Sequence, residues 1–145
     1  MATILMMDDD TDLVSSMRIV IEAQGHTFHA APDGERGLQL LREVNPDLII
    51  LDLMMNRYTE GFRVSQVIRD PAETSPFARF RHVPIVVFTS IHKTTPYRFG
   101  RDEASLPVDA FLEKSVPIER LLQTITDLLA RSAASRDGSA AVPAP

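Results

Sequence analysis

The sequence of 145 residues contains no cysteine, which excludes disulfides, thiolate metal sites and thiol nucleophiles. No apolar run reaches the length of a membrane span, and the N-terminus lacks the basic, apolar and small-residue order of a secretion signal. The formal net charge is −5, whereas a general nucleic-acid binder needs a basic stripe facing phosphates. These absences predict a cytoplasmic protein that binds neither a membrane nor nucleic acid.

Lysine is also scarce. Lys93 and Lys114 are the only lysines, and the other basic residues are arginine. The length suits one α/β domain with a core large enough to fold without cross-links. Lys114, one of two lysines and the one that follows the last predicted strand, therefore stands out.

Five short apolar runs alternate with amphipathic segments, which is the pattern of a doubly wound α/β sheet. The run 48–51, which ends at Asp52, predicts a fully buried strand, and 27–31 predicts an edge strand. Thr11 or Asp12 is expected to cap the first helix. The remaining strands are predicted at 4–7, 83–88 and 108–112, and the helices at about 11–25, 35–44, 62–70 and 117–131.

Three segments depart from this alternation. Residues 71–82 are expected to be an extended loop, and in 91–107 two prolines and a glycine leave room only for a short or irregular fourth helix. Residues 132–145 are rich in Ala, Ser, Gly and Pro, so we expect a disordered tail after a domain at 1–131.

Polar side chains stand where four of the predicted strands end. Asp8 and Asp9 follow the first strand, Asp52 the third, Thr89 the fourth and Lys114 the fifth. The carboxyl ends of parallel strands share one edge of the sheet, so these side chains are expected to converge if the first, third, fourth and fifth strands are neighbours. Three close carboxylates need a hard cation, and Mg²⁺ fits oxygen ligands and phosphate.

Each of these residues has an ordinary explanation when taken alone. Asp8 and Asp9 are typical of an acidic helix N-terminus, Asp52 of a turn, Thr89 of a strand and Lys114 of a solvated surface. Their joint occurrence in this order favours a different reading. A carboxylate, a divalent metal, a lysine and a hydroxyl are the groups needed to place a phosphoryl group on aspartate.

The segments ILMMDDDTD, PDLIILDLMM, VPIVVFTS and DAFLEKSV resemble the response-regulator receiver domain of two-component signalling, over about residues 2–131. The resemblance implies a flavodoxin-like five-stranded parallel sheet of order 2-1-3-4-5. It implies Asp52 as phosphoacceptor, with Thr89 and Lys114 acting on the phosphoryl group. The Mg²⁺ ligands would be Asp8, Asp9, Asp52 and the carbonyl of Met54, and the conformational switch would be Thr89 and Phe111.

Two positions depart from the family pattern. Asn56 replaces the usual proline in a loop, 56–61, that is one residue longer than usual. Ser115 replaces a proline that often follows the lysine through a cis peptide. A cis Lys114–Ser115 bond would cost about 3 kcal/mol, so either that bond is strained or the loop is rebuilt.

The resemblance implies a stand-alone phosphoacceptor rather than an enzyme. Its partners would be a histidine kinase or phosphotransfer protein and a downstream protein target, and it would be a monomer or weak homodimer. One alternative is a receiver-like module that binds partners without phosphorylation. Another is a small phosphohydrolase, since Asp8 to Thr11 also resembles the Asp-x-Asp-x-Thr start of haloacid-dehalogenase-type phosphatases. In that reading Asp8 is the nucleophile and Asp10 the acid/base, but Asp52 goes unexplained.

Overall fold

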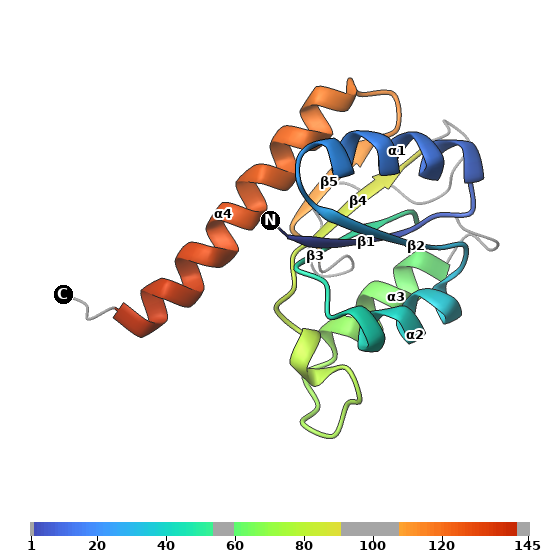
Figure 1. Ribbon diagram of the computed structural model, residues 1–145. Coiled ribbons are helices and arrows are strands. Elements are labelled where there is room, and N and C mark those ends of the chain that lie inside the picture. The colour runs from blue at the N-terminus through green and yellow to red at the C-terminus, as the bar shows by residue number, and fades with distance from the viewer. Residues whose placement is uncertain (1, 54–59, 91–107, 142–145) are drawn as a thin grey trace.

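The computed structural model describes residues 2–53, 60–90 and 108–141, and its strands form one parallel sheet of order β2-β1-β3-β4-β5. This confirms the predicted flavodoxin-like fold (Figure 1). The expected irregular fourth helix at 91–107 lies outside the described residues. The strands are β1 (Thr3–Met7), β2 (Thr27–Ala31), β3 (Leu48–Leu51), β4 (Ile85–Thr89) and β5 (Ala110–Glu113); the helices are α1 (Thr11–Ala23), α2 (Gly34–Val44), α3 (Glu60–Arg69), α4 (Ile118–Ala141) and the 3-10 helix η1 (Ala78–Phe80).

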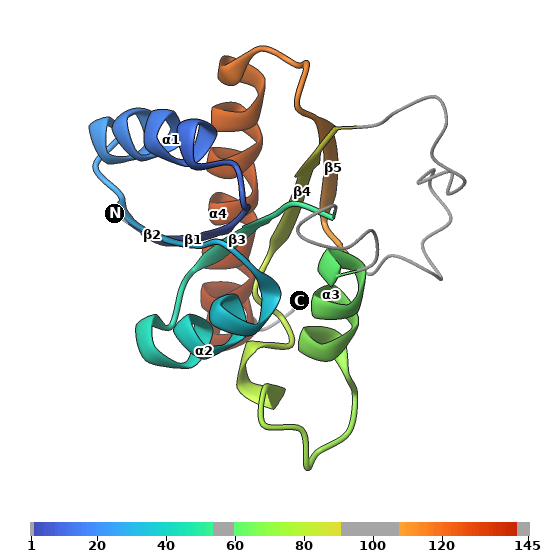
Figure 2. The same ribbon diagram turned by 90° about the vertical axis from the view of Figure 1, so that its right-hand side faces the viewer.

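Helices cover both faces of the sheet, with α1 and α4 on one side and α2 and α3 on the other (Figures 1 and 2). Successive side chains of a strand point to opposite faces, so β1 feeds both cores. Ile4 and Met6 pack in the core that includes α1 and α4, and Leu5 and Met7 in the core beneath α2 and α3. A strand buried on both faces must be apolar throughout, which is why β1 and β3 are continuous apolar runs.

The direction in which strands are added to the sheet changes beside β1. This strand pairs with β2 on one side and with β3 on the other, while β4 and β5 continue outward from β3. Ligands of open α/β sheets bind at such a switch point, outside the carboxyl ends of the strands. Asp8 follows β1 and Asp52 follows β3, so the topology places both at that point.

The first and last helices differ from the sequence prediction at their ends. Asp10, not Thr11 or Asp12, caps α1, because its side chain accepts the Leu13 amide at 3.1 Å while its own backbone is extended. Helix α4 continues to Ala141, so residues 132–141, expected in a disordered tail, are helical. Alanine is the strongest helix former, and no proline follows Pro117 until Pro143. Within the described residues, no helix is both long and apolar enough to cross a membrane.

Residues 71–82, expected to be an extended loop, contain the 3-10 helix η1 and the buried ring of Phe80. Arg69, at the end of α3, ties the segment to the sheet. Its guanidinium donates to the carbonyls of Arg81 at 2.6 Å and Val83 at 2.7 Å, and to the Asp109 carboxylate at 2.7 Å. One half-buried side chain thus joins α3, the segment before β4 and the start of β5.

Replacing Arg69 with alanine is expected to lower the free energy of unfolding by about 2–3 kcal/mol. The change leaves two carbonyls and a carboxylate without this donor; Asp109 is 40% exposed, so the loss falls below that of a fully buried pair. Urea denaturation followed by circular dichroism measures it. Arg63→Ala removes an exposed arginine from the same helix and is the control. Equal stabilities of the two variants would contradict the role of Arg69 in joining α3 to the sheet.

Candidate functional site

Asp52 lies directly after β3 and is buried, with 4% of its surface exposed. Thr89, at the end of β4, donates its hydroxyl to Asp52 Oδ1 at 2.7 Å. Lys114, just after β5, donates Nζ to Asp52 Oδ2 at 3.2 Å. The structure therefore brings together the three residues that the sequence placed at separate strand ends. Each oxygen of this carboxylate has its own donor, one neutral and one cationic.

Asp8 is the second buried carboxylate, with 3% of its surface exposed. Its Oδ1 accepts the backbone amide of Asp10 at 2.9 Å, and its Oδ2 lies 2.9 Å from Lys114 Nζ. Among the described residues, Oδ2 accepts no hydrogen bond of good geometry. Burial raises the pKa of Asp8 to about 6, although the Asp10 amide and Lys114 favour its ionised form. A buried carboxylate with a pKa this high is one that a further cation would stabilise.

Lys114 bridges the two buried carboxylates. Burial by itself would lower the pKa of its ammonium group, but the ion pair with Asp8 and the charge of Asp52 outweigh burial and raise it. The lysine thus remains protonated at neutral pH. The Lys114–Ser115 peptide is trans, because no cis peptide occurs among the described residues. Of the two alternatives left open for this loop, the rebuilt one is observed.

The acidic cluster suits a divalent cation. Asp8, Asp9 and Asp52 each offer a carboxylate oxygen, and these oxygens lie within 4.8 Å of one another. Asp9 is exposed, so the cluster opens to solvent on one side. Oxygen donors of this charge, with room for waters, are what Mg²⁺ prefers. The residues present therefore fit the ion, while the expected carbonyl ligand, Met54, lies outside the described residues.

The two residues expected to switch conformation lie on neighbouring strands, Thr89 on β4 and Phe111 on β5. Thr89 is 1% exposed and faces Asp52. Phe111, on β5, is half-buried and packs against the pair Leu53 and Val87, together with Phe62 of α3. The aromatic ring thus packs against a cluster that includes the residue immediately after Asp52.

Gly61 is a residue that sequence reasoning missed. The sequence predicts that it ends a loop, but it lies in the first turn of α3, packed against the backbone of the Asp52 segment. A Cβ atom at Gly61 would contact the carbonyl oxygen of Asp52 and lie 2.5 Å from the Cα of Leu53. A glycine at the entry of a helix nine residues after the carboxylate was the only available signal.

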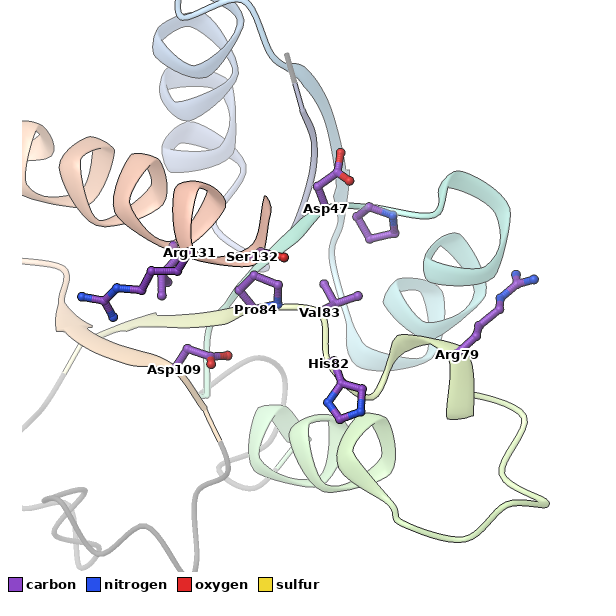
Figure 3. A pocket seen from close by; sticks show the side chains of 10 residues that line it. Asp47, Arg79, His82, Val83, Pro84, Asp109, Arg131 and Ser132 are labelled. Atoms are coloured by element: carbon purple, nitrogen blue, oxygen red, sulfur yellow. The ribbon is translucent and has the colours of Figure 1, made fainter. Parts of the chain in front are cut away.

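A cavity of about 410 Å³ lies at the opposite edge of the sheet (Figure 3). Pro84, which precedes β4, and Leu128 of α4 line it, and Asp109 at its wall already pairs with Arg69. The side chains of Arg79 and Arg131 point outward from it (Figure 3). The buried carboxylates of the described residues, Asp8 and Asp52, lie at the other ends of the strands.

Comparison with known proteins gives one family. The family model of the response regulator receiver domain matches residues 4–126. Protein PilH of Pseudomonas aeruginosa is 29% identical over 130 residues, covering 90% of this chain and 99% of PilH. The DNA-binding dual master transcriptional regulator RpaA of Synechocystis is 30% identical over 132 residues, covering 91% of this chain but 51% of RpaA. The chain thus spans nearly all of one curated relative and about half of the other.

Solved structures agree in fold. The receiver domain of the Francisella response regulator 1452 superposes with a TM-score of 0.72 at 22% identity, covering 91% of this chain and 99% of that one. The BeF3-activated N-terminal receiver domain of RstA from Klebsiella pneumoniae gives 0.69 at 19% identity, covering 88% and 97%. With the family match over most of the chain, and with carboxylates, hydroxyl and lysine gathered at one sheet edge, this chain belongs to the response regulator receiver domain family of two-component systems.

Proposed function

We propose that Asp52 accepts a phosphoryl group from a histidine kinase or phosphotransfer protein, and that this changes the affinity of the chain for a downstream protein. A carboxylate oxygen of Asp52 forms the new O–P bond as the P–N bond of the phosphohistidine breaks, and the released imidazole nitrogen keeps its electron pair. The observation that carries the proposal is the arrangement around Asp52. A hydroxyl and an ammonium group each contact one of its oxygens, beside two further carboxylates.

Asp8, Asp9, Asp52 and the carbonyl of Met54 would hold Mg²⁺, which supplies charge neutralisation for the incoming phosphoryl oxygens. Lys114, already bonded to Asp52 Oδ2, is placed to pair with a phosphoryl oxygen once the carboxylate is esterified. The Thr89 hydroxyl is placed to move its hydrogen bond from Asp52 Oδ1 to the same group. These residues act on their own phosphoryl group only, so the chain is proposed as an acceptor and not as an enzyme.

The switch is proposed to run from Thr89 to Phe111. Phe111 packs against the buried pair Leu53 and Val87; Leu53 directly follows Asp52, and Val87 lies two residues before Thr89 on β4. A shift of the Thr89 hydroxyl toward a phosphoryl group would change the space next to Val87. Phe111 would then change its packing on the outer strand β5, where a protein partner can detect it.

Intact-mass spectrometry after incubation with acetyl phosphate and Mg²⁺ tests the proposal. We expect one phosphoryl group on the wild type and none on Asp52→Asn, which preserves shape but removes the nucleophile. Asp33→Asn removes a carboxylate that caps α2 and is the matched control, expected to be modified like the wild type.

The other readings give different results. Uptake that survives Asp52→Asn and is lost in Asp8→Asn would indicate the phosphohydrolase chemistry. In the structure the carboxylate of Asp10, the acid/base of that reading, instead caps α1. Absence of uptake, with acetyl phosphate and with beryllofluoride alike, would indicate a module that works without phosphorylation.

A further inference from the structure

We infer that Asp10 is a positioning residue for the divalent cation: by capping helix α1, it fixes the backbone amide that orients Asp8. The inference rests on the proposed function, since the cation is the one used in phosphoryl transfer. It concerns a residue that ligates nothing itself. The oxygens that gather within 4.8 Å come from Asp8, Asp9 and Asp52, while Asp10 directs its own oxygen at a backbone amide.

Asp10 is held by three hydrogen bonds that use different groups. Its carboxylate oxygen Oδ1 accepts the amide of Leu13 at 3.1 Å, and its carbonyl accepts the amide of Val14 at 3.0 Å. Its own amide donates to Asp8 Oδ1 at 2.9 Å. The first two bonds anchor the residue on the first turn of α1, with φ −84° and ψ 99°. The third bond, from the amide fixed in this way, orients the carboxylate of Asp8.

The consequence for Asp8 follows from the contacts of its two oxygens. The Asp10 amide holds Oδ1, and Lys114 Nζ lies 2.9 Å from Oδ2. Rotation of the carboxylate about its Cβ–Cγ bond out of this orientation would lose both contacts, and Asp8 is only 3% exposed. The carboxylate is therefore fixed before a cation arrives. Groups that orient a metal ligand in this way typically contribute about 10- to 100-fold to metal affinity.

The side chain of Asp10 can be replaced with little effect on the core, because it is exposed. If it is cut back to alanine, the Leu13 amide loses its acceptor and the turn between β1 and α1 gains freedom. If it is changed to asparagine, an oxygen remains for the Leu13 amide and only the charge is lost. Asparagine and aspartate are nearly equal as N-caps, so the pair of variants separates capping from charge.

The experiment is isothermal titration calorimetry of Mg²⁺ into the full chain at fixed ionic strength. We expect Asp10→Ala to weaken Mg²⁺ binding about tenfold, and Asp10→Asn to bind close to the wild-type constant. Asp33→Ala is the matched control, since Asp33 caps α2 in the same manner, accepting the Arg36 amide at 2.7 Å after strand β2. It should lose a similar amount of thermal stability, with Mg²⁺ affinity unchanged.

Three results would overturn the inference. Equal Mg²⁺ affinity of Asp10→Ala and the wild type would mean that the cap does not position Asp8. Equal weakening by Asp10→Asn and Asp10→Ala would mean that Asp10 acts through its charge. A loss of affinity in Asp33→Ala that matches the loss in Asp10→Ala would mean that any cap loss acts through global stability. A wild type that binds no Mg²⁺ at all would contradict the metal site of the proposed function as well, so the two failures are distinguishable.

Discussion

Replacing Gly61 with alanine is expected to lower the free energy of unfolding by about 3 kcal/mol and to reduce phosphoryl uptake at Asp52. The new Cβ atom would contact the carbonyl oxygen of Asp52 and lie 2.5 Å from the Cα of Leu53. Both atoms belong to backbone that follows a buried central strand, so neither can yield without moving the carboxylate. Helix propensity alone predicts the opposite, since alanine in a helix is favoured over glycine by about 1 kcal/mol.

Gly37→Ala is the matched control, because Gly37 is also a helical glycine packed against the sheet. A Cβ atom there would meet the side chain of Met7, with Cγ at 2.8 Å, and not backbone. A methionine side chain adapts by rotation, so this variant should stay within about 1 kcal/mol of the wild type. Urea denaturation and uptake from acetyl phosphate measure both effects. A Gly61→Ala variant as stable as Gly37→Ala would show that the β3–α3 junction is not tightly packed.

Replacing Lys114 with methionine is expected to slow phosphoryl uptake by about a hundredfold, the usual cost of removing one donor to a developing negative charge. It should also lower stability at pH 7 by about 2–3 kcal/mol in chelator-containing buffer. The methionine leaves Asp8 and Asp52, which are 3% and 4% exposed, without their shared ammonium group. The loss stays below that of a fully buried pair, because the Lys114 side chain is 20% exposed.

Added Mg²⁺ should return part of this stability in Lys114→Met, since a cation at the acidic cluster replaces some of the lost positive charge. Thermal unfolding with and without Mg²⁺ measures the recovery. Arg36→Met removes an exposed cation from α2 and is the control, expected to change neither stability nor uptake appreciably. Recovery by Mg²⁺ that is no larger in Lys114→Met than in Arg36→Met would place the cation away from the two carboxylates.

Much of the site was predictable because the strand topology brings motifs that are separate in the sequence to one edge of the sheet. Thr89 and Lys114 lie 37 and 62 residues after Asp52 in the sequence, yet both side chains donate hydrogen bonds to its carboxylate. Parallel strands with apolar patterns on both faces permit few arrangements, and those in which β1, β3, β4 and β5 are neighbours place these ends together. The β2 edge strand and the buried β3 followed from composition in the same way.

Other features depend on contacts between segments, and sequence patterns do not predict which of these contacts form. Asp10, Thr11 and Asp12 are all acceptable caps by residue type, and only the backbone conformation selected Asp10. In the sequence Arg69 cannot be told from any other arginine at a helix end, but in the fold it donates hydrogen bonds to two carbonyls and to Asp109. The extent of α4 was underestimated because composition alone did not separate an alanine-rich helix from a disordered tail.

By itself the sequence determined the alternation of strands and helices, the apolar core of the sheet and the set of acidic, hydroxyl and lysine residues at its edge. These depend on hydrophobic periodicity and residue type, which are local properties of the chain. The tertiary structure alone decided that Lys114 bridges Asp8 and Asp52, that Asp10 holds Asp8 through its amide and that Gly61 packs on the Asp52 backbone. Such contacts depend on distances of a few ångströms between segments, and only the packed sheet fixes those distances.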